Sequence, residues 1–177
     1  MDILGYLIKR FFAFGADWYL SSVVINMIAS ALEKIFPQSE NGVYLSLLAA
    51  SVAVSFLYFV FIPTKVWKGQ TPLMKLLQLK IVDRDGKNPD IGTLTIRYFV
   101  GCLIFEGAFY MPSVNIRTVM ILTILKNHEM LSQVIVWAIT ISSILGVVIA
   151  LLDRKKEFRF IHDRISHTKV IEAGQIS

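Results

Sequence analysis

The sequence predicts an all-α polytopic membrane protein, with four transmembrane helices and a small cytoplasmic segment that has room for a short two-stranded sheet. Of its 177 residues, 55% are hydrophobic and only 18% are charged, and the mean hydropathy is +0.60. Two stretches, Val43–Ile62 and Leu131–Leu152, contain no Asp, Glu, Lys or Arg. Because about 20 helical residues cross a hydrocarbon core of ~30 Å, both stretches can span a bilayer. This composition excludes a soluble enzyme, a disordered tail and a disulfide-rich scaffold.

Four spans are predicted, and polar residues separate them. Pro63 is expected to stop the second span, because proline lacks the backbone N–H that a helix needs. After a polar loop over 63–90, Asp90 is the predicted N-cap of the third span. Residues 112–130 are expected to stay outside as a loop or an interfacial helix, and 153–177 form a cytoplasmic tail. The predicted spans are 11–32, 43–62, 91–111 and 131–152.

The charge distribution predicts the topology. Of the 18 basic residues, 15 lie in three segments: just before the first span, in or beside the central loop, and in the tail. Segments rich in Lys and Arg stay on the cytoplasmic side, which places both termini and the central loop in the cytoplasm, beneath a cell (inner) membrane. Although the net charge is +5, we interpret these residues as topology determinants and contacts for anionic lipid headgroups, not as a nucleic-acid site.

The polar segments also carry a strand signal. Apolar residues over 76–82 are interleaved with Lys80 and lead into Asp85-Gly86, a pattern typical of a short strand followed by a turn. In the tail, Thr168–Ile171 is predicted to form a second strand beside Lys80–Asp83. This pairing would close the chain at the inner face of the membrane.

Asp17 is the most informative single residue. An ionisable side chain inside an apolar helix is costly, so a functional site is the default hypothesis. At ~100° per residue, Arg10, Ala13, Asp17 and Ser21 share a stripe roughly 80° wide. This stripe is small and polar, so it should face protein and not lipid. Two interpretations stay open: Asp17 carries a proton or cation in a transport step, or it pairs permanently with an arginine and pins the helices together.

Further candidates lie in the third span and the tail. Glu106, in the outer half of the third span, is either a second station for a cation or proton or a solvated side chain near the outer interface. Asp163 is expected to point at Arg10 or Arg97, in a tail segment that is dense in hydrogen-bonding groups. The full set of transport or ion-pair candidates is Arg10, Asp17, Arg97, Glu106, Arg159, His162 and Asp163.

Neither a metal centre nor an enzyme active site is predicted. His162 and His167 are five residues apart, a spacing that does not place both on one helical face. Histidine beside Asp would suit nucleophilic catalysis, but no serine or cysteine can be nominated as the partner. We therefore expect no enzymatic activity, no cofactor and no bound metal.

Several motifs occur together in this chain. Gly69-Gln70-Thr71-Pro72 precedes Leu76-Leu77-x-Leu79-Lys80-Ile81-Val82-Asp83-x-Asp85-Gly86, and the tail carries Arg159-x-x-His162-Asp163-Arg164-x-x-x-Thr168-Lys169-Val170-Ile171. Together with Arg10, Asp17 and Arg97, they make the chain resemble the RDD family of small, mostly prokaryotic membrane proteins, named for one Arg and two Asp. The resemblance runs from Arg10 to Ile171 and implies a single membrane domain over 1–177.

The resemblance implies that Arg10, Asp17 and Asp163 are the naming residues. It also implies transport, including cation–proton exchange. The chain departs from the family pattern at Leu73-Met74, where Gly-Lys is frequent, and at Gln78, where glycine is common. We therefore expect a small transporter or transporter subunit, with a non-transporting membrane scaffold as the alternative. The expected partners are the lipid bilayer, a second copy of the chain and a small cation or proton, because four spans are few for a substrate pathway.

Overall fold

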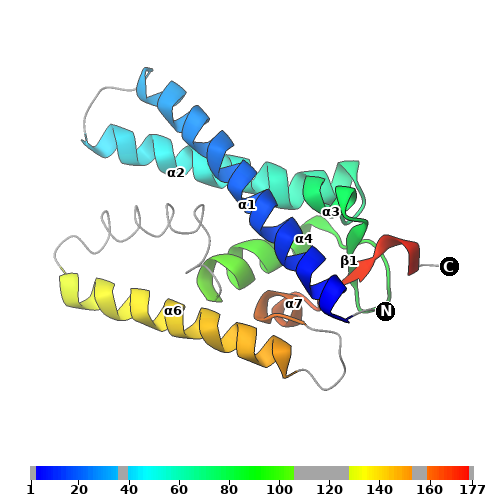
Figure 1. Ribbon diagram of the computed structural model, residues 1–177. Coiled ribbons are helices and arrows are strands. Elements are labelled where there is room, and N and C mark those ends of the chain that lie inside the picture. Colours follow the sequence, from blue (N-terminus) through cyan, green and yellow to red (C-terminus); the bar gives the residue numbers. More distant parts are fainter. Residues whose placement is uncertain (1–2, 36–39, 106–127, 153–158, 176–177) are drawn as a thin grey trace.

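The computed structural model describes residues 3–35, 40–105, 128–152 and 159–175 (Figure 1). Two long helical segments form an antiparallel hairpin. The first is α1 (Ile3–Glu33), and the second is α2 (Glu40–Phe56), which continues directly as the π-helix η1 (Leu57–Val66). The remaining elements are α3 (Pro72–Leu76), β1 (Leu79–Asp83), α4 (Ile91–Thr95), the π-helix η2 (Ile96–Phe105), α6 (Glu129–Leu151), α7 (Ile161–Ile165), β2 (Thr168–Glu172) and the 3-10 helix η4 (Ala173–Gln175).

Two helical segments are long and apolar enough to cross a membrane, Leu4–Glu33 and Gly42–Val66. They correspond to the first two predicted spans. A shorter apolar stretch, Gln133–Gly146, lies within α6. The four-span topology stays a prediction, because 106–127, which includes the end of the predicted third span and most of 112–130, lies outside the described residues.

The helix bounds extend one prediction and correct another. The first helix begins at Ile3, ahead of the predicted span 11–32, and its 31 residues extend about 46 Å, more than a hydrocarbon core requires. The prediction that Pro63 stops the second helix is wrong, since η1 runs through Pro63 to Val66. In a regular α-helix the proline ring clashes with the preceding turn, and the wider π-helical turn accommodates it.

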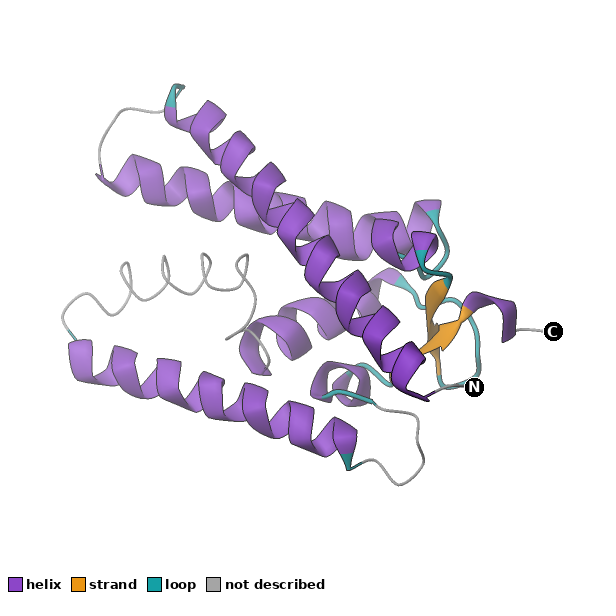
Figure 2. Cartoon of the chain, in the orientation of Figure 1, coloured by secondary structure: helices purple, strands orange, loops and turns teal. Residues whose placement is uncertain are grey.

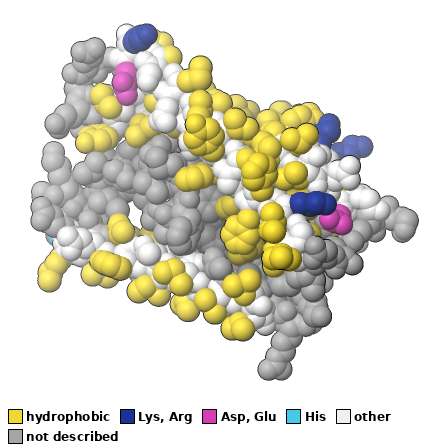
Figure 3. All heavy atoms as spheres, in the orientation of Figure 1, with side chains coloured by type: hydrophobic (Ala, Val, Ile, Leu, Met, Phe, Trp, Pro, Cys, Tyr) yellow, Lys and Arg dark blue, Asp and Glu magenta, His cyan; other side chains and the backbone are white. Residues whose placement is uncertain are grey.

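The outer surface of the long helices is apolar. Phe12 and Met27 on α1 and Trp137 on α6 are each more than 60% exposed. Figure 3 shows apolar side chains between two opposite ends where the charged side chains gather. An apolar surface between charged ends is what a bilayer requires of a protein that it surrounds.

The predicted strand pairing is confirmed. Strands β1 and β2 form a two-stranded antiparallel sheet in which Lys80 lies opposite Ile171 and Asp83 opposite Thr168. Figure 2 shows this sheet at the end of the molecule where both chain termini lie. Tyr6 of α1 donates a hydrogen bond to the Val170 carbonyl (2.7 Å), which fixes the sheet against the first helix.

A short helix, α3, lies where the sequence suggested only loop and the start of a strand. Thr71 is its N-cap and Pro72 its first residue, an arrangement that favours helix initiation. Gly69 precedes it at φ +97°, and a Cβ there would lie 2.3 Å from the Ile81 carbonyl oxygen. Only glycine therefore lets this loop lie directly against β1. Gln78, where the resemblance led us to expect glycine, adopts φ +57°.

The third helix begins as predicted. Asp90 is the N-cap of α4, and its Oδ1 accepts a hydrogen bond from the Thr93 amide (2.7 Å). Helix α4 continues into η2, which packs against α7 and α6. Buried side chains from α1, η1, α3, β1, α4, η2 and β2 form the larger hydrophobic cluster, at the sheet end of the molecule, and a smaller cluster joins α1 and α2.

Candidate functional site

Two buried carboxylates define the candidate site, and they lie in different surroundings. The first, Asp163, is on α7. Its Oδ2 accepts a hydrogen bond from Arg10 Nη2 and its Oδ1 accepts one from Arg97 Nη1. Arg97 Nη1 also donates to Thr168 Oγ1. We call Arg10, Asp163 and Arg97 the ion triad; it joins α1, η2 and α7, which are far apart in the sequence.

Neighbouring groups complete the surroundings of Asp163. The Phe160 amide donates to its Oδ2 (3.0 Å), which holds the first turn of α7. The Phe160 ring lies against the Arg10 guanidinium, with Cζ 4.6 Å from the ring centroid. His162 Nε2 is 3.6 Å from Asp163 Oδ2, and the His162 ring stacks between Phe14 and Phe160. The Asp163 carboxylate is thus surrounded by two arginines, the Phe160 amide and the His162 ring.

The ion triad keeps Asp163 charged. Burial by itself would raise the pKa of Asp163, but the Arg10 and Arg97 guanidinium groups outweigh it and hold the pKa well below its usual range. Both oxygens have charge-assisted partners, and the side chain is completely buried. Such a carboxylate is suited to hold the tail in place, because taking up a proton would leave two buried arginines without a counter-ion.

The second carboxylate, Asp17, is held by neutral donors. Its Oδ1 accepts hydrogen bonds from the Tyr58 hydroxyl (2.7 Å) and the Leu73 amide (3.0 Å), and its Oδ2 accepts one from Thr71 Oγ1. The predicted buried stripe on α1 is confirmed, since Arg10, Ala13, Asp17 and Ser21 are all buried. Asp17 therefore joins the first span to η1 and to the start of α3.

Of the two interpretations of Asp17, permanent pairing with an arginine is contradicted within the described residues, where Asp17 forms no ion pair and Arg10 and Arg97 bind Asp163. Arg10 is two turns away along α1 and is bound to Asp163 instead. The physical reason is competition: Asp163 places both of its oxygens between Arg10 and Arg97, whereas hydroxyl and amide donors already satisfy Asp17.

Sequence reasoning missed Tyr58 and Thr71, the two side chains that bind Asp17. A signal existed for each. A phenol inside an apolar span needs a hydrogen-bond partner, and Thr-Pro marks the start of a helix. The sequence could not show that both would meet Asp17, since the three residues belong to separate segments of the chain.

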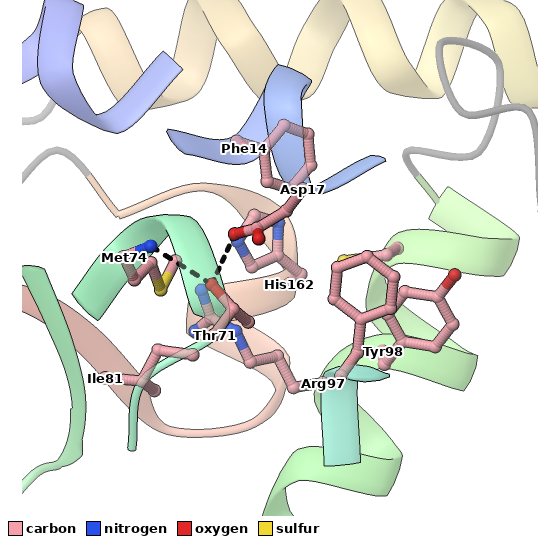
Figure 4. A pocket seen from close by; sticks show the side chains of 10 residues that line it. Phe14, Asp17, Thr71, Met74, Ile81, Arg97, Tyr98 and His162 are labelled. Carbon is pink, nitrogen blue, oxygen red and sulfur yellow. Dashed lines mark hydrogen bonds between the residues drawn. The ribbon is translucent and has the colours of Figure 1, made fainter. Parts of the chain in front are cut away.

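A small cavity lies beside Asp17 and Arg97. Its volume is about 30 Å³, room for a small ion or one or two waters. Asp17, Arg97 and His162 contribute to its wall, together with aromatic and aliphatic side chains. Figure 4 shows Asp17 and His162 close together on one side, with Arg97 extending toward them from η2. The cavity thus has a carboxylate and a guanidinium in one enclosure.

The remaining predicted residues fall into three groups. His162 is buried where α7 meets η2, and a Cβ at Gly101 would lie 2.5 Å from the His162 Cβ, so the two elements are in close contact. Arg159 contributes its backbone carbonyl, which accepts a hydrogen bond from Arg164 Nε (3.2 Å), and it is not one of the two guanidinium groups bound to Asp163. Glu106 lies outside the described residues.

No metal centre is present among the described residues, because no three His, Cys, Asp or Glu side chains lie close enough to share an ion. Cys102, the only cysteine, is buried in the wall of the cavity.

Comparison with known proteins gives one match. The model of the RDD family matches residues 4–167, nearly the whole chain. No curated protein and no solved structure matches the chain.

Proposed function

This chain belongs to the RDD family of membrane proteins, and from that premise we propose that it is a small transporter with a proton- or cation-coupled step at Asp17. The observation that carries the proposal is the surroundings of Asp17. It is a buried carboxylate in an apolar span, it lines a cavity, and its partners in the described part of the chain are neutral donors. Such a carboxylate has no fixed counter-ion, so it can take a proton or a small cation in turn.

The ion triad supports a division of roles. Arg10 and Arg97 are both bound to Asp163, so in the described part of the chain neither forms an ion pair with Asp17. We propose that the triad braces the cytoplasmic end while Asp17 exchanges its counter-ion. The helices carrying the triad then form a rigid frame around the cavity.

We further propose that the chain crosses the membrane four times, with both termini in the cytoplasm, and works as a homo-oligomer. The position of both termini at the sheet end supports the first statement (Figure 1). The size of the described cavity, about 30 Å³, supports the second, since it is small for a substrate pathway within one copy.

Ion flux in proteoliposomes tests the proposed function. Purified protein faces an imposed pH gradient while Na⁺, K⁺ and Li⁺ are added in turn. We expect a cation-dependent collapse of the gradient that Asp17→Asn abolishes and Asp85→Asn, a change in an exposed turn, leaves intact. A folded, correctly oriented wild type without flux for any of the three cations would overturn the proposal.

The second candidate is a non-transporting membrane scaffold. The buried ion triad favours it, because buried ion pairs that hold a tail against two helices need no transported ion to explain them. A scaffold predicts that Asp17→Asn lowers thermal stability or partner binding while the wild type shows no flux.

A further inference from the structure

Arg97 has hydrogen-bond donors that the ion triad does not use. Its bonds to Asp163 and Thr168 both come from Nη1, and in the described part of the chain Nε and Nη2 donate to no acceptor. The side chain is only 8% exposed, and it lines the cavity beside Asp17. A guanidinium that is largely shielded from bulk water gains from an acceptor for its free N–H groups, because hydrogen bonds from a charged donor are stronger than those from a neutral one.

The cavity wall determines which ligand suits these donors. Apart from a few polar tips, the wall is built from side chains such as Phe59, Met74 and Cys102. An anion entering this space loses most of its hydration, which is most costly for small or doubly charged anions such as fluoride and sulfate. A guanidinium is itself weakly hydrated and binds planar or polarisable anions well. The volume of about 30 Å³ admits a single such ion.

We propose that the cavity binds one weakly hydrated monovalent anion, such as chloride or nitrate, against Nε and Nη2 of Arg97. The ion triad carries a net positive charge, because two guanidinium groups share one carboxylate. An anion in the cavity compensates this excess. It also gives the unused Arg97 donors their acceptor.

The charge on Asp17 controls this site. A charged Asp17 repels an anion in the same cavity, and a protonated Asp17 does not. By reciprocity, a bound anion favours the protonated form, so anion and proton bind together. This coupling rests on the proposed role of Asp17, whereas binding at Arg97 does not. The titratable or polar groups that bind Asp17 or share its cavity are Tyr58, Thr71, Arg97, Tyr98, Cys102 and His162.

The test is thermal unfolding of the full-length protein in detergent, with chloride replacing gluconate at constant ionic strength and constant cation. A ligand that binds only the folded state raises the melting temperature along a saturable curve. We expect such a curve for the wild type. For Asp17→Asn, the chloride concentration at half-saturation should be at least about tenfold lower. Cys102→Met fills the cavity without altering the triad and should abolish the response, while the control Cys102→Ala keeps it.

A wild-type melting temperature that does not respond to chloride would overturn the proposal, as would a full response in folded Cys102→Met. If Cys102→Met does not fold, the anion series decides. Nitrate and bromide stabilising more than fluoride supports the site, and the reverse order contradicts it. A melting temperature that does not respond to chloride would overturn the anion site but not the proposed cation flux. An absence of cation flux would overturn the proposed function but not the anion site.

Discussion

At the scale of the residue, two aspartates of one chain have opposite surroundings. Asp163 lies between two arginines and is held permanently charged, while Asp17 lies among hydroxyl and amide donors. The donor set, and not burial, separates their roles, because both side chains are almost fully buried.

Removing the charge of Asp163 should strongly destabilise the fold. Asp163→Asn leaves Arg10 and Arg97 buried without a counter-ion, a situation that costs about 3–5 kcal/mol in comparable sites. The control Asp85→Asn, in an exposed turn, should have no effect. Thermal unfolding in detergent measures both. Equal melting temperatures for the two variants would show that the triad contributes no stability.

The same carboxylate predicts the pH dependence of stability. Because the pKa of Asp163 is lowered in the folded chain, its contribution is present at every pH above the ordinary Asp value of about 4. It is lost as the pH falls from about 4 through the folded-state pKa. Unfolding midpoints should therefore show no Asp163-dependent change between pH 5 and 8, and a wild type that converges on Asp163→Asn within that range would contradict this.

Thr71 is expected to stabilise the fold through its hydrogen bond to Asp17. Its hydroxyl donates to Asp17 and accepts from the Met74 amide as the N-cap of α3. Thr71→Val keeps the shape and removes both bonds, so we expect a loss of about 1–3 kcal/mol in unfolding free energy. Thr71→Ser retains the hydroxyl and should stay near wild type. If the two variants unfold at the same temperature, the link between α1 and α3 is not stabilising.

At the scale of the element, the tail docks through one close contact and one sheet. Gly101 on η2 lets α7 approach, and β2 pairs with β1. Both contacts bring the ion triad together, so loss of either should release the tail.

Gly101→Ala tests the close contact. The added Cβ would lie 2.5 Å from the His162 Cβ, and separating the elements should cost about 1–3 kcal/mol. Gly15→Ala is the matched control, since nothing lies within 4 Å of its Cβ and alanine favours a helix. Faster trypsin cleavage after Arg164 or Lys169 in Gly101→Ala alone would report the released tail, and unchanged cleavage would contradict the docking.

A disulfide tests the sheet register. Lys80 and Ile171 lie directly opposite, so Lys80→Cys with Ile171→Cys should crosslink readily. Lys80→Cys with Lys169→Cys is offset by two residues and should crosslink poorly. Free-thiol counting by mass spectrometry distinguishes the pairs, with Cys102 as the internal reference. Preference for the offset pair would mean that the register is different.

At the scale of the whole molecule, hydropathy and charge predicted much of the arrangement. Charge-free runs located the second helix, and alternation followed by Asp-Gly located the first strand. The prediction at Pro63 failed because proline usually ends an α-helix, where its ring clashes with the preceding turn. The π-helical turn of η1 relieves this clash. The partners of Asp17 were missed for a different reason. Arg10 is the neighbour of Asp17 along α1, but in the folded chain Arg10 binds Asp163, and Tyr58 and Thr71 bind Asp17.

The most direct test of the account compares Asp17→Asn with Asp17→Glu in the same proteoliposome flux measurement. Each flux is normalised to the amount of folded, inserted protein. We expect folded Asp17→Asn to lose cation-dependent proton flux, whereas Asp17→Glu, which keeps a carboxylate, should retain part of it. Undiminished flux from folded Asp17→Asn would contradict the account, because the coupled carboxylate would then lie elsewhere.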